Sequence, residues 1–392
     1  MALPPIHEDT LFMARKRTID DIARLAGVSK TTVSRVLNNK PDVDPNTRER
    51  ILRIVKEEGF VPSATAAGLA GGRSHLLGVL VPSFTWPMIP DIVCGIAETI
   101  GNTAYELVLY SLNDKTRENG EGDIIDHILS TNLVAGILAV LPGQSSKFVI
   151  RLHQHGFPVV LIDDQDDPPL VPWIGADNQC GAYDAVKHLL ALGHRRIAHI
   201  QGPMKYVCSR ERYEGYCQAL REHGIPVDPA LVVEGAFDTV SGRDAAQTFL
   251  SLPEDQRPTA IFAGSDLMAY GVLAFAEEQG IDIPGQLALV GFDAIGSSAL
   301  VRPALTTVKQ PFEEMGQRGI EVLLSIIEHS DQQRMNVRPG YTRDFMSPSR
   351  ARVDEPANAP PLRIQLATSL VVRASCGMQQ RSPFSSIKSI SR

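Results

Sequence analysis

Short polar and basic side chains gather on one face of a candidate helix near the N-terminus. The residues of this face are Lys30, Thr31, Ser34, Arg35 and Asn38. Hydroxyl, amide, ammonium and guanidinium groups of this kind form hydrogen bonds with base edges and phosphates in the major groove of DNA. The other face of the segment carries Val33, Val36 and Leu37 at the spacing of a buried helical stripe. The segment therefore predicts a helix that reads DNA.

Capping and turn residues would position this helix. Thr18 can cap a first helix, with Asp20 and Asp21 in the first turn, where the helix dipole favours negative charge. Gly27 supplies the turn, and Ser29 can cap the second helix. Thr18 and Ser29 are also expected among the DNA contacts. Together the caps, the turn and the polar face favour a helix-turn-helix over an ordinary helical hairpin with a solvated surface.

Charge is divided unevenly along the chain. Residues 15–73 contain 12 Lys and Arg against 7 Asp and Glu, a net charge of +5, whereas residues 74–392 carry −10 and the whole chain −7. A basic head on an acidic body fits a protein with one end attracted by phosphates and the rest repelled. Neither part is charged strongly enough for non-specific packaging of nucleic acid.

Length and composition bound the class of protein. The 392 residues are expected to form two or three domains. No run approaches the ~20 apolar residues that span a bilayer, and the N-terminus lacks the apolar core of a secretory signal, so a cytoplasmic, nucleoid-associated protein is expected. The five cysteines are scattered and odd in number, which is typical of reduced thiols. We expect no cofactor and no bound metal.

Residues 61–74, VPSATAAGLAGGRS, form a linker with helical potential between the head and the body. So short a helix, weakened by Gly68, would need a partner helix or DNA to persist in water. Without such a partner, a flexible linker is an equally good interpretation.

From Leu76 onward, short apolar runs alternate with amphipathic stretches. The runs are LLGVLVP, ELVLYSL, VAGILAV, FPVVLID, RIAHIQG, AIFAG and LALVGFD. Buried runs separated by helical patterns are typical of parallel strands with crossover helices, so the body is predicted to be α/β. Ligands of such sheets bind at the carboxyl ends of the strands.

Candidate ligand-binding residues follow these strands. They are Phe84, Trp86, Asp163, Arg210, Ser265, Asp266 and Asp293. Carboxylates and a guanidinium make paired hydrogen bonds to neighbouring hydroxyls, and aromatic faces cover the apolar side of a ring, so the set suits a neutral polyhydroxylated ligand. Taken singly, each carboxylate is better explained as a helix cap or loop ion pair, and Asp266 in particular is expected to be mainly a cap.

Ten short motifs follow one another in a fixed order between Thr18 and about Cys376. They are TIDDIARLAGVSKTTVSRVLNN, TRERILRIVKEEGFVPS, LLGVLVP, GADN, LGHRRIAHIQGP, RERYEGY, SDLMAYGVL, LVGFDA, ALTTVKQP and LVVRASC. In this order they resemble the LacI/GalR (lactose-repressor) family of bacterial transcription regulators. The resemblance implies an α/β protein with an N-terminal all-α helix-turn-helix headpiece and a hinge helix. It also implies a core similar to type I periplasmic-binding proteins, in which two subdomains with parallel sheets are joined by three crossovers.

The resemblance assigns DNA-binding roles to individual residues. Lys30 and Thr31 occupy the two base-reading positions at the start of the recognition helix, and Arg35 is the family's arginine one turn later. Leu69 matches the hinge leucine that wedges into the minor groove at the centre of the operator.

The resemblance also assigns effector contacts in the core. The matching positions are Asp163, Arg210, Ser265 and Asp293, with Phe84 and Trp86 in the loop that lines the cleft. Ser265 replaces an asparagine of some sugar-responsive members, which leaves the identity of any sugar open.

The domains are expected at 1–15 (disordered extension), 16–60 (headpiece), 61–74 (hinge), 75–376 (effector-binding and dimerisation core) and 377–392 (flexible tail). Within the core, the first subdomain is expected at about 75–174 and 304–330, and the second at about 175–303 and 364–376. Residues 330–363 are expected to be an irregular insertion after a helix that ends near His329. The tail has no leucine heptads, so a homodimer is expected rather than a coiled-coil tetramer.

The sequence thus predicts a sequence-specific DNA-binding regulator, in particular a repressor of a carbohydrate-utilisation operon. A small sugar-like effector would release it from, or recruit it to, a palindromic double-stranded operator. A purine- or nucleoside-responsive regulator of the same family is the alternative. A solute-binding protein shares the core, but the basic head argues against it. Catalysis is disfavoured because the sequence shows no GxSxG, GxxxxGK or GxGxxG motif and no metal-spaced histidines.

Overall fold

The computed structural model describes residues 17–37, 40–60, 74–111, 133–140, 146–163, 171–336 and 362–377. They form two compact units with a boundary near Leu76. The predicted extension 1–15, almost all of the linker, and the tail from residue 378 lie outside the described residues, as do Asn38 and Leu69. Within the described ranges, no helix is both long and apolar enough to cross a bilayer.

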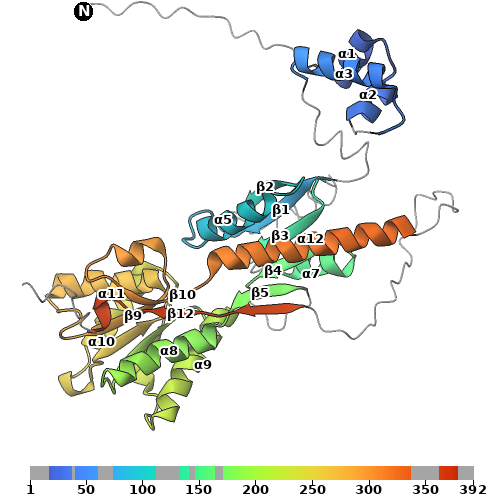
Figure 1. Cartoon of the computed structure of the whole chain (residues 1–392). Coiled ribbons are helices and arrows are strands. Elements are labelled where there is room, and N and C mark those ends of the chain that lie inside the picture. The colour runs from blue at the N-terminus through green and yellow to red at the C-terminus, as the bar shows by residue number, and fades with distance from the viewer. Residues whose placement is uncertain are drawn as a thin grey trace, which may run out of the picture. The chain divides into compact units, whose positions relative to one another are not determined.

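The N-terminal unit consists of three helices, α1 (Ile19–Ala26), α2 (Lys30–Leu37) and α3 (Pro45–Glu57) (Figure 1). The predicted capping box is present: Thr18 Oγ1 accepts from the Asp21 amide at 3.4 Å, and the Asp21 carboxylate accepts from the Thr18 amide at 3.0 Å. Gly27 ends α1 with a φ of 63°, a left-handed conformation that costs glycine little. Each helix contributes one fully buried side chain to the small core, namely Ile22, Val33 and Ile51.

The first subdomain of the C-terminal unit has a six-stranded sheet with the order β11-β5-β4-β3-β1-β2. Its strands are β1 (Leu76–Val81), β2 (Glu106–Ser111), β3 (Gly136–Val140), β4 (Val159–Ile162), β5 (Trp173–Ala176) and β11 (Arg363–Leu366). The pairs from β1 through β3, β4 and β5 to β11 are parallel. Its helices are α5 (Ile89–Ile100), α7 (Ser146–Gln154) and α12 (Phe312–Asn336). α12 packs against β3, β4, β5 and α5, and α7 packs against β4.

Glycine allows α5 and α12 to approach closely. A β-carbon on Gly95 would lie 2.0 Å from the carbonyl oxygen of Glu313, and one on Gly316 would lie 2.1 Å from that of Ile92. Because these distances are far below van der Waals contact, a larger residue at either position would push the two helices apart.

The second subdomain has a six-stranded sheet with the order β12-β10-β9-β8-β6-β7. Its strands are β6 (Ile197–Gln201), β7 (Val232–Glu234), β8 (Ala260–Ala263), β9 (Ala288–Asp293), β10 (Thr306–Lys309) and β12 (Ser369–Val371). All pairs are parallel except the antiparallel edge pair β10–β12. Its helices are α8 (Asn178–Ala191), α9 (Val207–Glu222), α10 (Thr239–Leu250) and α11 (Asp266–Gln279). The short 3₁₀ segments are η2 (Pro229–Leu231), η3 (Glu254–Gln256), η4 (Gly296–Ala299) and η5 (Ala374–Cys376).

The helices of the second subdomain pack in pairs, α8 with α9 and α10 with α11. One apolar cluster joins α8 and α9 to the sheet and includes fully or almost fully buried Tyr216, Phe262 and Phe292. A second cluster joins α10 and α11 to the sheet and includes Phe249 and Met268. The sheet is therefore buried on both faces, as the continuous apolar runs of its strands predict.

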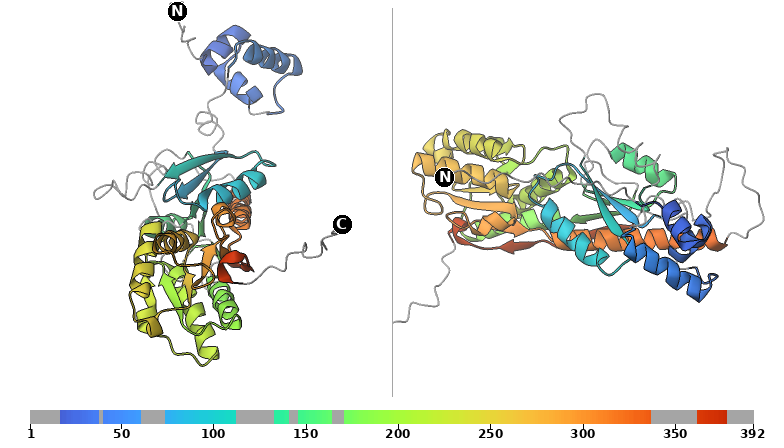
Figure 2. Two further views of the ribbon diagram at one scale, coloured as in Figure 1. Left: turned by 90° about the vertical axis from the view of Figure 1, so that its left-hand side faces the viewer. Right: turned by 90° about the horizontal axis from the view of Figure 1, so that it is seen from above.

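Three segments connect the two subdomains, between β5 and α8, between β10 and α12, and between β11 and β12 (Figure 1, Figure 2). The first and third are hydrogen-bonded to each other. The Asp177 amide donates to the carbonyl oxygen of Leu366 at 2.8 Å, and the Thr368 hydroxyl donates to that of Asp177 at 3.1 Å. The α/β fold with parallel sheets and three crossovers agrees with the prediction.

The predicted subdomain boundaries are wrong at two strands. β10 was assigned to the first subdomain with residues 304–330 but pairs with β9 in the second sheet, because the chain crosses only after Lys309. β11 was assigned to the second subdomain with residues 364–376 but pairs with β5 in the first sheet. In addition, α12 continues to Asn336, into the predicted irregular insertion, whose residues 337–361 lie outside the described part of the chain.

Candidate DNA-binding surface and strand-end polar cluster

The predicted DNA-reading residues lie together on α2. Lys30, Thr31 and Arg35 are exposed and Ser34 is half-buried, while Val33 and Val36 of the same helix are buried. Ser29 precedes the helix, and its hydroxyl accepts from the Thr32 amide at 3.2 Å, which is the predicted cap. The headpiece therefore holds α2 by its apolar side and leaves the polar side open to a partner.

Two carboxylates contact the basic side chains of this surface. Lys30 Nζ lies 2.6 Å from Asp20 Oδ2, which belongs to α1, and Arg35 Nη1 lies 2.9 Å from Asp42 Oδ2, which precedes α3. All four side chains are at least half exposed. Both basic side chains of α2 are thus paired within the headpiece.

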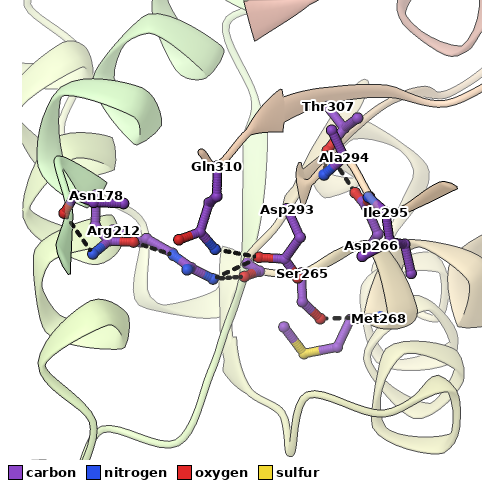
Figure 3. Close-up of polar contacts among 12 residues, drawn as sticks. Asn178, Arg212, Ser265, Asp266, Met268, Asp293, Ala294, Ile295, Thr307 and Gln310 are labelled. Atoms are coloured by element: carbon purple, nitrogen blue, oxygen red, sulfur yellow. Dashed lines mark hydrogen bonds and ion pairs between the residues drawn. The ribbon is translucent and has the colours of Figure 1, made fainter. Parts of the chain in front are cut away.

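In the second subdomain, Arg212 is the centre of a buried polar cluster (Figure 3). Its Nε donates to Asn178 Oδ1 at 3.0 Å, its Nη1 donates to the carbonyl oxygen of Gly264 at 2.6 Å, and Nη1 lies 3.6 Å from Asp293 Oδ1. The guanidinium lies 3.9 Å from the centre of the Phe292 ring. Arg212 therefore joins the start of α8 to the carboxyl ends of β8 and β9.

Asp293 and Gln310 form the other side of this cluster. Gln310 Nε2 donates to Asp293 Oδ1 at 2.7 Å, and Gln310 belongs to the crossover that follows β10. Asp293 has a φ of 117°, a backbone conformation that is strained for a residue with a side chain. We call Asn178, Arg212, Asp293 and Gln310 the strand-end cluster; two of its four members, Asn178 and Gln310, lie at crossovers between the subdomains.

Asp266 is fully buried beside this cluster but has a structural role. Its carboxylate accepts from the Ile295 amide at 3.0 Å, from the Ser298 hydroxyl at 2.5 Å and from the Thr307 hydroxyl at 2.5 Å. The prediction that Asp266 mainly caps a helix is wrong, because Ser265 is the N-cap of α11 and accepts from the Met268 amide at 3.3 Å. Asp266 instead bonds both to the loop that follows β9 and to strand β10, and so holds the loop against that strand.

Burial shifts the ionisation of both aspartates. Burial raises the pKa of the Asp266 carboxyl, the charge of Asp293 raises it further, and the hydrogen bonds from Ser298 and Thr307 oppose the change. Burial also raises the pKa of Asp293, against the effect of the Arg212 charge. The two carboxyls are therefore easier to protonate than exposed aspartates.

Asp163, at the end of β4, brings a carboxylate of the first subdomain toward the same region. Its φ of 50° is left-handed. Burial raises the pKa of the Cys208 thiol on α9 to about 11, and both Asp163 and Asp293 contribute to the increase through their charges. Ligands of α/β sheets bind at such strand ends, and a contact of Asp163 with an effector stays a prediction.

The other predicted effector contacts, Phe84, Trp86 and Arg210, lie outside the strand-end cluster. Phe84 is 53% exposed and Trp86 is half-buried, both in the loop after β1. Arg210 Nη1 donates to the carbonyl oxygens of Met204 and Lys205 at 3.0 Å each. Arg212, which the sequence did not single out, is the arginine beside Asp293, because positions 210 and 212 of a helix point about 200° apart and Arg212 is the one that faces the sheet. The effector contact expected of Arg210 stays a prediction.

Sequence reasoning also missed Asn178 and Gln310. One signal could have identified Arg212: the spacing of Arg212, Tyr216 and Ala219 is i, i+4, i+7, and the last two are apolar. An arginine on a buried helical stripe requires a buried partner. Asn178 and Gln310 carried no such signal, since each is an ordinary polar residue at the edge of a helix or strand.

Comparisons with known proteins agree with this architecture. Residues 18–63 match the bacterial regulatory proteins of the lacI family, and residues 186–344 match the periplasmic binding protein-like domain. The chain is 34% identical over 307 residues to catabolite control protein A of Priestia megaterium, which covers 78% of this chain and 91% of that protein. It is 36% identical over 309 residues to the HTH-type transcriptional repressor CytR of Escherichia coli K12, and the match covers 78% of this chain and 89% of that protein.

Solved structures show the same fold. The lac repressor dimer bound to operator and the anti-inducer ONPF has a TM-score of 0.73 at 26% identity, covering 92% of this chain and 99% of that one. The complex of the transcriptional regulator CelR with cellobiose has a TM-score of 0.63 at 29% identity, with 92% and 99% covered.

A helix-turn-helix headpiece joined to a two-subdomain, periplasmic-binding-protein-like core defines a class of DNA-binding regulatory proteins. This chain belongs to the lacI family of bacterial regulatory proteins and is a DNA-binding transcriptional regulator. In the part of the chain that the structure describes, no group of three His, Cys, Asp or Glu side chains could hold a metal ion.

Proposed function

We propose that the protein is a repressor of carbohydrate-utilisation genes that acts in the cytoplasm as a homodimer on a palindromic operator. Lys30, Thr31, Ser34 and Arg35 read bases in the major groove. The strand-end cluster binds a neutral, sugar-like effector, which changes the relation of the two subdomains and with it the affinity for DNA. A coupling of about 1–3 kcal/mol would change operator affinity by about 5- to 150-fold.

The buried pair of Arg212 and Asp293 carries the effector proposal. A guanidinium and a carboxylate side by side present donors and acceptors with no net charge, which suits adjacent hydroxyls of a neutral ligand. Buried Gln310 Oε1 and Ser209 Oγ have no hydrogen-bond partner among the described residues. Since buried polar atoms are normally satisfied, a bound polyol supplies the missing hydrogen bonds.

The location of the cluster supports the coupling. Asn178 and Gln310 lie at two of the three crossovers and bond directly to Arg212 and Asp293. A ligand that competes for these hydrogen bonds acts on the segments about which the subdomains move. Differential contacts in two arrangements of the subdomains are what an allosteric ligand requires.

A screen for stabilising ligands tests this proposal. Thermal unfolding of the full-length protein is measured with sugars, sugar phosphates and nucleosides, since a ligand at 100 times its Kd adds about 2.7 kcal/mol of stability. A duplex that the protein binds tightly is first selected from a random library. The ligand that stabilises the protein should change the affinity of the protein for this duplex. Asp293→Asn should abolish the stabilisation by the ligand, and Arg243→Gln, which breaks an exposed ion pair with Glu278, should retain it. Stabilisation by charged compounds alone, or no stabilisation by any compound, would contradict a neutral sugar effector.

A nucleoside or purine effector is the second candidate. It is favoured by similarity to a transcriptional repressor PurR of Photobacterium profundum, 30% identical over 323 residues, covering 81% of this chain and 94% of that protein. In the same screen, stabilisation by nucleosides and not by sugars would select it. We further propose that the protein is not an enzyme, so chromatography after incubation should recover each ligand unchanged; a product would contradict this.

A further inference from the structure

The carboxylates of Asp20 and Asp42 both contact recognition-helix cations from outside that helix. Asp20 reaches Lys30 from α1, and Asp42 reaches Arg35 from the segment before α3. The pair of Arg17 with Glu58, 2.7 Å apart, involves no residue of α2. The pairs of Arg24 with Asp21 and of Arg53 with Glu49 lie within one helix at i,i+3 or i,i+4 spacing. Such spacing is common on helix surfaces.

A carboxylate beside a DNA-contacting cation opposes binding in two ways. It must give up its hydrogen bond before the cation can reach DNA, and its own charge then lies close to the phosphates. Asp20 and Asp42 are both about half exposed, so they lie on the surface that a duplex would approach. In water such a pair is weak, but repulsion from a nearby phosphate array is stronger because DNA carries one charge per about 1.7 Å.

We propose that Asp20 and Asp42 are specificity determinants that suppress binding to DNA of random sequence. On random DNA, Lys30 and Arg35 would gain phosphate contacts alone, and the internal pairs compete with these. On an operator, the same side chains also gain base-edge hydrogen bonds, which replace the carboxylate contacts. The two aspartates thus reduce affinity for random DNA more than affinity for an operator. This inference rests on the proposed base-reading roles of Lys30 and Arg35.

Binding of a random-sequence duplex tests the inference directly. The affinity of full-length Asp20→Asn and Asp42→Asn for a labelled ~30-bp duplex is measured by fluorescence anisotropy from 50 to 200 mM salt. Each variant frees one cation to replace a counterion, so the slope of log K against log salt should steepen by about 0.9. The ratio of variant to wild-type affinity should accordingly fall about 3.5-fold over this fourfold range of salt. At 50 mM salt both variants should bind more tightly than wild type.

Two controls separate this effect from a change of net charge. Glu49→Gln removes the same charge from the headpiece but breaks the intrahelical pair with Arg53, so it should change binding less than Asp20→Asn does. In a Lys30→Met background, Asp20→Asn should no longer steepen the salt slope, because the cation that it frees is gone, and only the relief of repulsion from the phosphates remains. An equal effect of Glu49→Gln, or an equal steepening by Asp20→Asn without Lys30, overturns the inference.

Binding of a selected, operator-like duplex completes the test. For a duplex selected from a random library by the wild-type protein, the ratio of selected to random affinity should fall severalfold in Asp20→Asn and Asp42→Asn. An unchanged ratio overturns the inference and leaves base reading intact. If Lys30→Met and Arg35→Met leave the affinity and base preference for the selected duplex unchanged, base reading itself fails, which is a separate outcome.

Discussion

The guanidinium of Arg212 lies 3.6 Å from the carboxylate of Asp293, and the two side chains are only 5% and 12% exposed. They are brought together by different elements, since Arg212 faces inward from α9 and Asp293 ends the central strand β9. Each charge is costly to bury and is compensated by the other together with Asn178, Gly264 and Gln310. The pair therefore depends on both partners.

Removal of one partner should be strongly destabilising. We expect Arg212→Met to lower the free energy of unfolding by about 3–5 kcal/mol, because Asp293 is left buried without its cation. Urea denaturation followed by circular dichroism measures this. The matched control is Arg243→Met, which breaks an exposed pair with Glu278 and should leave stability almost unchanged. Similar losses in both variants would contradict the burial argument.

The raised pKa of Asp266 has a consequence for stability as a function of pH. The folded protein holds the proton on the Asp266 carboxyl more tightly than the unfolded chain does. The stability that this proton contributes is therefore fully present below the pKa of the unfolded chain, and it is lost as the pH rises through the pKa of the folded protein. The side chain in Asp266→Asn cannot ionise, so this variant does not lose stability by this route as the pH rises. The variant will be less stable at acid pH because its hydrogen bonds are weakened, but its deficit should shrink between pH 5 and pH 8. Denaturation midpoints at both values test this, and parallel profiles would contradict it.

Close packing of α5 and α12 can be tested at Gly95. Gly95→Ala places a methyl group 2.0 Å from the carbonyl oxygen of Glu313, so we expect a loss of about 1–3 kcal/mol in unfolding free energy. Gly101→Ala is the matched control, since its methyl group would meet its nearest atom, the Ala97 carbonyl oxygen, at 3.4 Å. A thermal shift of equal size in the two variants would show that the helix contact has been overestimated.

Substitutions on α2 should separate affinity from base preference. Arg35→Ala is expected to weaken binding to a selected duplex more than to random DNA, and substitution of Lys30 or Thr31 should change which bases are selected. Sequencing of duplexes enriched from a random library by each variant gives the preference. Equal losses on selected and random DNA would indicate phosphate contacts alone.

The helix-turn-helix was predictable from the sequence because its signals are local. The caps at Thr18 and Ser29 and the turn at Gly27 are determined by neighbours within four residues, and the structure confirms them. Alternating apolar runs predicted the strands for the same reason. In both cases the residues that determine the structure are close together in the chain.

The strand-end cluster was predictable only in part, because its contacts are long-range. Asp293 was recognisable as a carboxylate after a strand, but its partners Arg212 and Gln310 are 81 and 17 residues away. No local pattern distinguishes Arg212 from Arg210 except the periodicity of α9. The assignments of β10 and β11 failed similarly, since the choice of sheet depends on pairing with β9 and β5 rather than on composition.

The strands β11 and β12 have a consequence for synthesis of the protein. Only Ala367 and Thr368 separate them, yet β11 is the edge strand of the first sheet and β12 the edge strand of the second. As the chain leaves the ribosome, each sheet lacks one edge strand until residues 363–371 have emerged. Domains commonly fold one after another from the N-terminus during translation. Here both subdomains reach completion almost simultaneously, once these residues have emerged, whereas the headpiece depends on none of them for its core.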